Sequence, residues 1–385
     1  MEKLVSVLIP AYNHEKYIKK AIESVLNQTY KNIEVIVEDD CSTDNTVREI
    51  KKIKDKRLKT IFSKKNKGPV KTMNHLLSIC KGDYIAILGS DDVWYPDKLE
   101  KQLPYFKNKK IGAVFSMMDV VDENDRINEN DPIIEIFKNK NMSRGQRMRC
   151  FFEKGNHLCH PTSIISRKAF EDIGYYNCAY RQLHDFDYWV RLTSKYDIYI
   201  LNDKLIGYRR VSNGQNLSSA TNEHILMHIN EENNIIQYLF KIIDDNTFVD
   251  GFKPLFKNKN SSSKNELICE KFLILLGSKI GDVNNKYLAI NYLSTLDNCN
   301  EIMELLEKKY NYKLAKFYKD NARLHNFYDD NIIMNNNESI RHYRDDYEQL
   351  HNEYERAVDE LNRLYNSKSW KITKPLRFVT ERIKK

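Results

Sequence analysis

The sequence lacks several features that mark whole classes of protein. It has no run of about 18 or more apolar residues, which a membrane-spanning helix needs. It has no second pair of closely spaced cysteines for a structural zinc site, and no zinc-finger spacing or RNA-binding signature. After the first strand-like run it has Ala-Tyr-Asn-His at residues 11–14, where a nucleotidyltransferase would want a glycine-rich phosphate loop. These absences argue against membrane-spanning, zinc-finger and nucleotidyltransferase proteins.

The cysteines indicate where the protein works. There are seven, an odd number without the spacing of a disulfide framework, so we expect reduced thiols in a cytoplasm. Residues 4–9 are too short for the apolar core of a signal peptide and have no small-x-small cleavage site, so they are better interpreted as a strand. The cluster of His157, Cys159 and His160 offers only three close metal ligands, and we interpret it as structural.

Charge and hydrophobicity set wider limits. A hydrophobic content of 41% supports a real core, and 62 Lys and Arg against 54 Asp and Glu give a net charge of +8. That charge suits nucleic acid, anionic lipid or a phosphorylated substrate. Because no nucleic-acid-binding signature accompanies it, we expect no nucleic-acid partner.

Strand and helix patterns alternate up to about residue 120. Strand-like runs occupy residues 5–9, 33–37, 58–62, 84–88 and 113–117. Between the first two, apolar residues recur at the spacing of one helix face. These residues are Ile18, Ala21, Ile22, Val25 and Leu26. Strict alternation predicts an α/β fold with a mostly parallel sheet covered on both faces.

The chain then changes character. Residues 122–141 are polar and aperiodic, as in an insertion or a mobile loop. A strand at 162–165, a helix from Arg167 and a pair of strands at 198–201 and 205–208 complete a first domain, predicted to span 1–219. Residues 220–335 are predicted to be a helical domain with a polar break at 258–264.

The carboxyl-terminal part carries two further patterns. Residues 336–366 have apolar residues spaced three and four apart, which predicts a coiled-coil-like helix and a possible homodimer through 340–364; a lone amphipathic helix packed on the helical domain is the alternative. Residues 367–385 mix basic residues with Trp370 and aliphatic side chains, which suits a peripheral membrane anchor. A solvated basic tail fits that composition equally well.

Three acidic clusters are the strongest functional signal. Asp39 and Asp40 follow one strand-like run, Asp91 and Asp92 follow another, and Asp185 begins a helical stretch. In an open α/β sheet, ligands bind beyond the carboxyl ends of the strands. Two carboxylate pairs there predict one crevice for a cation and a nucleotide or polyhydroxyl ligand, with the third cluster supplying a base.

Several motifs in this order resemble the inverting glycosyltransferases of family 2. They are Ser-Val-Leu-Ile-Pro-Ala-Tyr-Asn at 6–13, Ile-Glu-Ser-Val-Leu-Asn-Gln-Thr-Tyr at 22–30, Asp-Asp-Cys-Ser-Thr-Asp-Asn-Thr at 39–46 and Ser-Asp-Asp-Val-Trp-Tyr-Pro-Asp-Lys-Leu at 90–99. The resemblance covers roughly residues 4–215. It implies a GT-A fold, a nucleotide-binding α/β sandwich that transfers a sugar from a nucleotide donor.

The resemblance assigns the donor site. Pro10, Ala11 and Tyr12 are expected to form the wall on which the base stacks. Asp40 matches the position that hydrogen-bonds the base, commonly uracil, so the donor is expected to be a UDP-sugar. A helix cap shared with Ser42 and Asp44 is the structural alternative for Asp40.

The diphosphate and its cation come next. The resemblance places Asp92 on Mn²⁺ or Mg²⁺ and Asp91 on the ribose, with Asp91 a second possible metal ligand. Many members carry another acidic residue where Gly89 stands here. Lys71 is a candidate phosphate contact, although many members have an arginine where this chain has Met73.

The acceptor side depends on Asp185. In His-Asp-Phe-Asp-Tyr-Trp-Val-Arg at 184–191 it takes the position of the family's catalytic base, with His184 where a glutamate is usual. Asp187 is predicted to pair with Arg191 at i+4. The alternative for the whole cluster is structural: acidic residues in the first turn of a helix interact favourably with the helix dipole.

A last motif, at 208–218, resembles the loop that closes over the donor. Members often carry a histidine near the position of Val211, so Arg209 or Arg210 is expected to contact the diphosphate instead. The leading interpretation is an inverting, metal-dependent glycosyltransferase at the cytoplasmic membrane surface, with a cell-surface glycan or lipid-linked acceptor. A catalytically weak or inactive scaffold of the same fold is the alternative.

Overall fold

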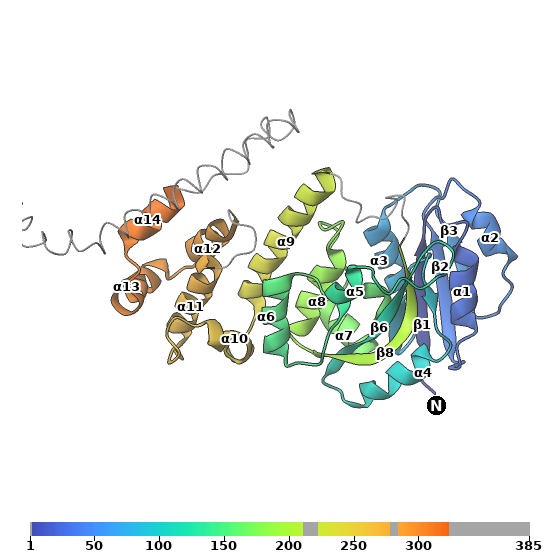
Figure 1. Cartoon of the computed structure of the whole chain (residues 1–385), viewed down its shortest axis with the longest axis horizontal. Coiled ribbons are helices and arrows are strands. Elements are labelled where there is room, and N and C mark those ends of the chain that lie inside the picture. The colour runs from blue at the N-terminus through green and yellow to red at the C-terminus, as the bar shows by residue number, and fades with distance from the viewer. Residues whose placement is uncertain (1, 211–221, 278–283, 323–385) are drawn as a thin grey trace, which may run out of the picture. The chain divides into compact units, whose positions relative to one another are not determined.

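The computed structural model describes residues 2–210, 222–277 and 284–322 (Figure 1). Contacts divide the chain into a unit of residues 1–323 and a unit of residues 324–385. The second unit lies outside the described residues, and with it the predicted coiled-coil-like helix and basic tail. Val211 and the predicted donor loop at 211–218 lie outside them as well. Among the described helices, none combines the length and the apolar character needed to cross a membrane.

An eight-stranded mixed sheet forms the centre of the first unit, in the order β3-β2-β1-β4-β7-β6-β8-β5. β3, β2, β1 and β4 are parallel neighbours, as the alternation of strand and helix predicts, and β6 and β8 are parallel as well. β7 lies antiparallel between β4 and β6, and β5 pairs antiparallel with β8. The strands are β1 (Val5–Ala11), β2 (Ile33–Asp39), β3 (Leu58–Phe62), β4 (Tyr84–Ile87), β5 (Val93–Trp94), β6 (Ile111–Val121), β7 (Ile164–Ser166) and β8 (Asp197–Arg209).

The pair of strands expected at 198–201 and 205–208 is wrong, because both belong to the single strand β8. Exposed polar residues at 202–204 suggest a turn in the sequence, but in the structure they lie within the strand. β6 pairs with β8 along its whole length. Next to Met117 the register shifts, so that residues 202 and 203 have no partner in β6 while β8 continues. A bulge of this kind interrupts the alternation of side chains without ending the strand.

Helices cover both faces of the sheet and bury two hydrophobic clusters (Figure 1). One face carries α1, whose buried residues are those predicted from their spacing, together with α2 and α4. The other face carries α3, α6, α7 and α8. Their bounds are α1 (Ile18–Leu26), α2 (Thr46–Lys52), α3 (Pro69–Ile79), α4 (Lys98–Gln102), α6 (Arg144–Lys154), α7 (Arg167–Ile173) and α8 (His184–Thr193). Short 3-10 turns are η1 (Leu103–Lys107) and η2 (His160–Thr162).

The polar segment at 122–141 is not wholly irregular, because it contains the short helix α5 (Ile133–Phe137). After the sheet, the described part of the chain is helical, as predicted, and the predicted break at 258–264 falls before α11. The helices are α9 (Asn222–Ile242), α10 (Asp245–Phe252), α11 (Lys264–Gly277), α12 (Asn284–Ser294), α13 (Cys299–Tyr310) and α14 (Leu314–Ala322), with a 3-10 turn η3 (Lys253–Leu255).

The helical region shares a hydrophobic core with the face of the sheet that carries α8. The ring of Phe152 in α6 lies 5.2 Å from that of Phe240 in α9 and 5.9 Å from that of Phe252 in α10. α6 and α10 also meet backbone to backbone at Gly145 and Gly251, where an added Cβ on Gly251 would lie 1.9 Å from the carbonyl oxygen of Gly145. The first helices of this region are therefore packed into the sheet domain. The boundary at residue 219 remains a prediction from sequence.

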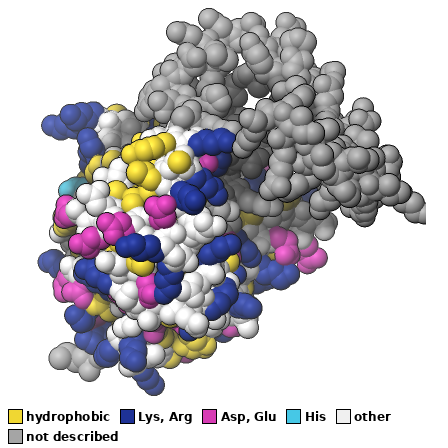
Figure 2. Space-filling model, turned by 90° about the vertical axis from the view of Figure 1, so that its left-hand side faces the viewer, with side chains coloured by type: hydrophobic (Ala, Val, Ile, Leu, Met, Phe, Trp, Pro, Cys, Tyr) yellow, Lys and Arg dark blue, Asp and Glu magenta, His cyan; other side chains and the backbone are white. Residues whose placement is uncertain are grey.

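The outer surface of the helical region is mixed in character. Figure 2 views the molecule from this side and shows hydrophobic side chains gathered among lysines, arginines and acidic residues. Exposed large apolar side chains of α12 and α14 include Tyr287, Leu314 and Tyr318. Some exposed apolar surface is normal for a soluble fold.

Candidate active site

The residues predicted to bind the nucleobase of the donor lie together at the carboxyl ends of β1 and β2. Pro10 and Ala11 end β1, and the next residue, Tyr12, is 44% exposed, so its ring is available for stacking. Asp40 directly follows β2, and its backbone N–H donates to the carbonyl oxygen of Ala11 at 2.8 Å. Two neighbouring parallel strands thus bring an open aromatic ring and a buried carboxylate to one edge of the sheet.

Asp40 does not cap a helix. Its two carboxylate oxygens accept the backbone N–H groups of Lys67 and Gly68, each at 2.8 Å, just before α3. Asp39 and Asp44 hold the turn before α2, since they accept the N–H groups of Ser42 at 3.0 Å and Thr46 at 2.9 Å. Asp40 therefore ties the end of β2 to the start of α3, and a carboxylate oxygen has further lone pairs for a ligand N–H.

The two loops beside Asp40 lock each other in place. Asn13 donates its backbone N–H to Ser42 Oγ at 2.9 Å, and its side-chain oxygen accepts the N–H of Thr43 at 2.8 Å. Asn13 and Cys41 have φ values of 52° and 66°, the left-handed region that non-glycine residues seldom adopt. Such strained residues cluster at ligand sites, where the surrounding structure holds them.

Lys71 lies in the first turn of α3 and is exposed. Among the described residues, none forms a hydrogen bond or an ion pair with its ammonium group. Met73, which replaces an arginine common in the family, is 3% exposed and packs into the core. Of these two positions, Lys71 alone presents a cation at the site edge.

The Asp91-Asp92 loop follows β4, at the same edge. Asp92 is 2% exposed, and its Oδ1 accepts the backbone N–H of Arg209 at 2.8 Å. Burial raises the pKa of Asp92 well above its usual range, and the Asp91 carboxylate raises it further. An added Cβ on Gly89 would lie 2.5 Å from Asp92 Oδ2 and 3.0 Å from Asp91 Oδ1. Both carboxylates thus converge on a spot that the glycine leaves free of side-chain atoms.

These carboxylates fit a divalent cation. Among the described residues, no group of three or more His, Cys, Asp or Glu side chains is arranged to hold a metal. Mg²⁺ and Mn²⁺ prefer oxygen ligands, and Mg²⁺ commonly takes only one or two carboxylates together with substrate phosphates and waters. The open space between Asp91 and Asp92 suits that coordination, because a cation there would offset the charge that burial penalises.

Arg209, a predicted diphosphate contact, is 2% exposed and braces this loop. Its Nε donates to the carbonyl oxygen of Asp91 at 2.7 Å, and its other nitrogens donate to the carbonyl of Asp122 and the carboxylate of Asp125. The guanidinium lies 4.5 Å from the ring centre of Tyr17. All these partners are protein groups, so direct contact with a diphosphate remains a prediction. Arg210 is half exposed and lies 3.5 Å from Asp131.

Asp185 lies in the first turn of α8, and both of its oxygens are held. Oδ2 accepts the side-chain N–H of Asn156 at 2.9 Å, and Oδ1 accepts the N–H of Phe186 at 2.8 Å. Burial raises the pKa of this carboxyl, and the charge of His184 and these hydrogen bonds offset part of the rise. A carboxylate with a raised pKa and a fixed orientation is suited to act as a general base.

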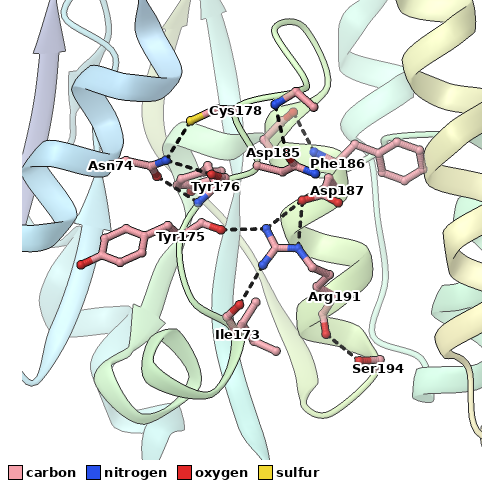
Figure 3. Close-up of polar contacts among 12 residues, drawn as sticks. Asn74, Ile173, Tyr175, Tyr176, Cys178, Asp185, Phe186, Asp187, Arg191 and Ser194 are labelled. Atoms are coloured by element: carbon pink, nitrogen blue, oxygen red, sulfur yellow. Dashed lines mark hydrogen bonds and ion pairs between the residues drawn. The ribbon is translucent and has the colours of Figure 1, made fainter.

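The ion pair predicted between Asp187 and Arg191 is confirmed, with Nη2 and Oδ2 2.7 Å apart. Figure 3 shows the Arg191 guanidinium between this carboxylate and the carbonyl oxygens of Ile173 and Tyr175, at 2.9 and 3.0 Å. The same turn is tied to α3, since Asn74 and Tyr176 exchange two hydrogen bonds through side chain and backbone (Figure 3). The helix with Asp185 and the helix with Lys71 therefore hold a common turn.

The two imidazoles of the His157, Cys159 and His160 cluster are both held by protein groups. His157 Nδ1 donates to the carbonyl oxygen of Gly155, its Nε2 accepts from the Arg147 guanidinium, and burial lowers its pKa to about 4. His160 bonds the Tyr176 hydroxyl at 2.8 Å, and burial lowers its pKa to about 3. Both imidazoles have protein partners and stay neutral near pH 7.

Cys159 is a buried thiol whose pKa responds to both the predicted base and the predicted metal ligand. Burial raises the pKa of this thiol well above its usual range, and the carboxylates of Asp92 and then Asp185 raise it further. Both carboxylates therefore lie within electrostatic reach of one buried sulfur, although 93 positions separate them in sequence. The sequence singled out Cys159 only as part of a structural cluster, and it did not indicate Asn156 or the bracing role of Arg209, because neither has a motif of its own.

Comparison with known proteins agrees with this geometry. The profile of Glycosyl transferase family 2 matches residues 6–174. An uncharacterized glycosyltransferase of Methanocaldococcus jannaschii is 34% identical over 213 residues, which are 54% of this chain and 70% of that protein. The Escherichia coli protein "UDP-Glc:alpha-D-GlcNAc-diphosphoundecaprenol beta-1,3-glucosyltransferase WfaP" is 45% identical over 114 residues, 30% of this chain and 45% of that protein.

Solved structures give the same fold. The crystal structure of Staphylococcus aureus TarS aligns with a TM-score of 0.52 at 21% identity, covering 82% of this chain and 53% of that chain. The structure of TarS 1-349 in complex with UDP aligns with a TM-score of 0.50, covering 82% of this chain and 88% of that chain. With the family match and the relatives, this shows that the chain belongs to glycosyl transferase family 2 and is a glycosyltransferase with the GT-A fold.

Proposed function

We propose that this glycosyltransferase is inverting and metal-dependent, and that it moves a sugar from a UDP-sugar to a hydroxyl of a cell-surface glycan or lipid-linked acceptor. The observation that carries the proposal is the Asp185 carboxylate. Asn156 and the Phe186 N–H hold both of its oxygens at the start of α8, and burial raises its pKa.

Asp185 would act as the general base. It would take the proton of the acceptor hydroxyl while that oxygen attacks the anomeric carbon on the side opposite the leaving nucleotide. The held orientation favours this step, because a base fixed before the reaction needs no reorganisation during it. Its raised pKa makes it a stronger base than an exposed aspartate.

The opposite side of the site would hold the nucleotide. Tyr12 would stack on the base, Asp40 would accept a hydrogen bond from the uracil N–H, and Asp91 would bind the ribose. Asp92, alone or with Asp91, would hold Mn²⁺ or Mg²⁺, which neutralises charge on the diphosphate leaving group. Lys71 would contact the diphosphate, since it is exposed in the first turn of α3 and no described residue pairs with its ammonium group.

The donor and acceptor classes rest on relatives as well as on this chain. The E. coli relative is named for UDP-glucose and a diphosphoundecaprenol acceptor, and one TarS structure holds UDP. We infer a UDP-hexose donor and an acceptor on a lipid carrier or a surface glycan. This would place the protein in the cytoplasm, at the inner face of the membrane.

Two partner proposals concern residues outside the described part. If residues 367–385 bind the membrane, their deletion will reduce binding to anionic vesicles. If residues 340–364 form a homodimer, Leu350→Asp will convert the dimer to a monomer in sedimentation. A wild-type protein that is already monomeric at high concentration would exclude the dimer.

The test is a donor panel of UDP-, GDP-, CMP- and dTDP-sugars, with and without Mn²⁺. Hydrolysis and binding are compared for wild type, Asp92→Ala and Asp185→Asn. We expect metal-dependent turnover of a UDP-sugar that both variants lose, while Asp185→Asn still binds UDP. Failure to bind any donor would favour the inactive scaffold. Turnover that Asp185→Asn retains would refute its role as the base.

A further inference from the structure

The start of α8, which carries Asp185, is held by a carboxylate from the helical region. Glu231 of α9 is 6% exposed. Its Oε1 accepts the backbone N–H of Arg181 at 2.7 Å, and its Oε2 accepts those of Gln182 at 2.9 Å and Leu183 at 2.7 Å. One buried side chain therefore binds three successive N–H groups.

These three groups lie directly before the base. Leu183 is the N-cap residue of α8, and its own side chain forms no capping hydrogen bond. A helix start needs acceptors for its free N–H groups, and a leucine cannot supply one. Glu231 supplies the acceptor from another element, two residues before Asp185 and 48 positions away in sequence from Leu183.

The next residue of α9, Glu232, lies against Gly155, the residue before the second support of Asp185. An added Cβ on Gly155, whose φ is 68°, would lie 2.4 Å from Glu232 Oε1. Gly155 directly precedes Asn156, whose amide donates to Asp185 Oδ2. Adjacent residues of α9 thus lie against both segments that orient the Asp185 carboxylate.

α9 is itself anchored, so it can act as a fixed support. Ile235, Ile236, Leu239 and Phe240 are at most 1% exposed and belong to the cluster shared with α6 and α8. None of α9 lies in the matched family region at 6–174. The residues proposed to bind the nucleotide lie on β1, β2, α3 and the loop after β4.

We propose that Glu231 is a positioning residue for the transfer step: it fixes the segment before α8 and so the orientation of Asp185, which makes the helical region part of the catalytic apparatus. This inference rests on the proposed role of Asp185 as base. It predicts that changes at Glu231 slow turnover and leave nucleotide binding intact.

Glu270 provides a matched control. It is a buried glutamate of α11, whose Oε2 accepts the N–H of Lys257 at 2.6 Å. Its Oε1 accepts the N–H of Asn258 at 2.9 Å and the Ser261 hydroxyl at 2.8 Å. It too holds a loop through three hydrogen bonds, but that loop supports no residue proposed for the site.

The experiment compares Glu231→Gln, Glu231→Asp and Glu270→Gln in the full chain with Mn²⁺. UDP is the binding probe, and turnover is hydrolysis of the substrate that wild type accepts among UDP-glucose, UDP-galactose and UDP-N-acetylglucosamine. We expect Glu231→Gln to lower kcat by about ten- to a hundredfold, since a misplacement of about 1 Å can cost that much. The Kd for UDP should stay within about twofold of wild type, as the nucleotide site lies on other elements.

Glu231→Asp keeps the charge but is one methylene shorter, so we expect an intermediate loss and a folded protein. Glu270→Gln should lower the melting temperature as much as Glu231→Gln but leave kcat unchanged. Equal kcat in the two Gln variants, or a parallel loss of UDP binding and turnover at Glu231, would overturn the inference. If Asp185→Asn remains active, the proposed base fails instead, whatever Glu231 does.

Discussion

At the scale of single residues, the carboxylates of the site differ in what holds them. Asp40 accepts two backbone N–H groups and Asp185 accepts one backbone N–H and one amide, whereas Asp92 has one such partner, the Arg209 N–H. A carboxylate with charge-assisted hydrogen bonds keeps its negative charge and its position. The least supported of the three is therefore the one expected to gain most from a cation.

Asp40→Asn should weaken nucleotide binding. An amide has one oxygen where the carboxylate has two, so the N–H of Lys67 or of Gly68 loses its acceptor and the charge disappears. We expect the Kd for UDP to rise by about tenfold or more, from about 1.5–3 kcal/mol per charged hydrogen bond. Calorimetric titration with UDP measures it. Asp44→Asn, in the neighbouring loop, is the control and should bind UDP as wild type does. If Asp44→Asn keeps its stability but binds UDP more weakly than Asp40→Asn, Asp40 is not the residue that binds the nucleotide.

The acid limb of the pH–rate profile should report Asp185. The base must be ionised, and burial raises the pKa of its carboxyl above the ordinary value of 3.8. Turnover should therefore fall as the pH drops through this raised pKa, at a higher pH than an exposed aspartate would give. Measurement of kcat/KM against pH checks it. A flat profile down to about pH 4, the ordinary range of an aspartate, would exclude Asp185 as the base.

The same shift has a consequence for stability, with a defined sign. A carboxyl whose pKa is raised by folding favours the folded state at low pH, and this contribution is lost as pH rises through the folded pKa. At pH 7 the charged Asp185 therefore costs stability, and Asp185→Asn should raise the melting temperature by about 1–3 °C. Burial raises the pKa of Asp187 as well, but Asp187→Asn should lower the melting temperature, because it leaves the largely buried Arg191 guanidinium without its ion-pair partner. Calorimetry at pH 7 measures the melting temperatures of both variants. A melting temperature of Asp185→Asn below that of wild type would contradict this prediction.

At the scale of elements, close packing of α6 on α10 joins the helical region to the sheet domain. Gly251→Ala would bring a Cβ to 1.9 Å from the carbonyl oxygen of Gly145, so the two helices must separate. We expect a loss of about 1–3 kcal/mol in the free energy of unfolding, the typical cost of overpacking. Gly277→Ala, at the end of α11, meets no atom within 4 Å and serves as the control. Urea unfolding measures both; equal effects would contradict the packing.

At the scale of the whole molecule, folding should require the first helices after the sheet. Phe240, Phe248 and Phe252 are each at most 1% exposed and complete the core over α6 and α8. A chain that ends at residue 219 would expose this surface, so we expect it to aggregate or to lose its cooperative transition. A chain that ends at residue 323 should melt within about 3 °C of the full length, since the contacts of the first unit are retained. Thermal circular dichroism tests both; cooperative melting of the shorter chain would show that the sheet domain folds alone.

The sequence by itself determined the alternating strands and helices, the parallel half of the sheet, and the carboxylates at the strand ends. These depend on local periodicity and on residues adjacent in sequence, such as Asp40 after β2 and Asp187 four positions before Arg191. Tertiary structure decided that β8 is one strand, that Arg209 braces the Asp91-Asp92 loop, and that Glu231 holds the start of α8. The physical reason is that Arg209 and Glu231 act through a few hydrogen bonds to residues 48 to 118 positions away, and that β8 stays one strand through its pairing with the distant β6. A single donor or acceptor leaves no period in the sequence, so only the folded chain shows which partner it finds.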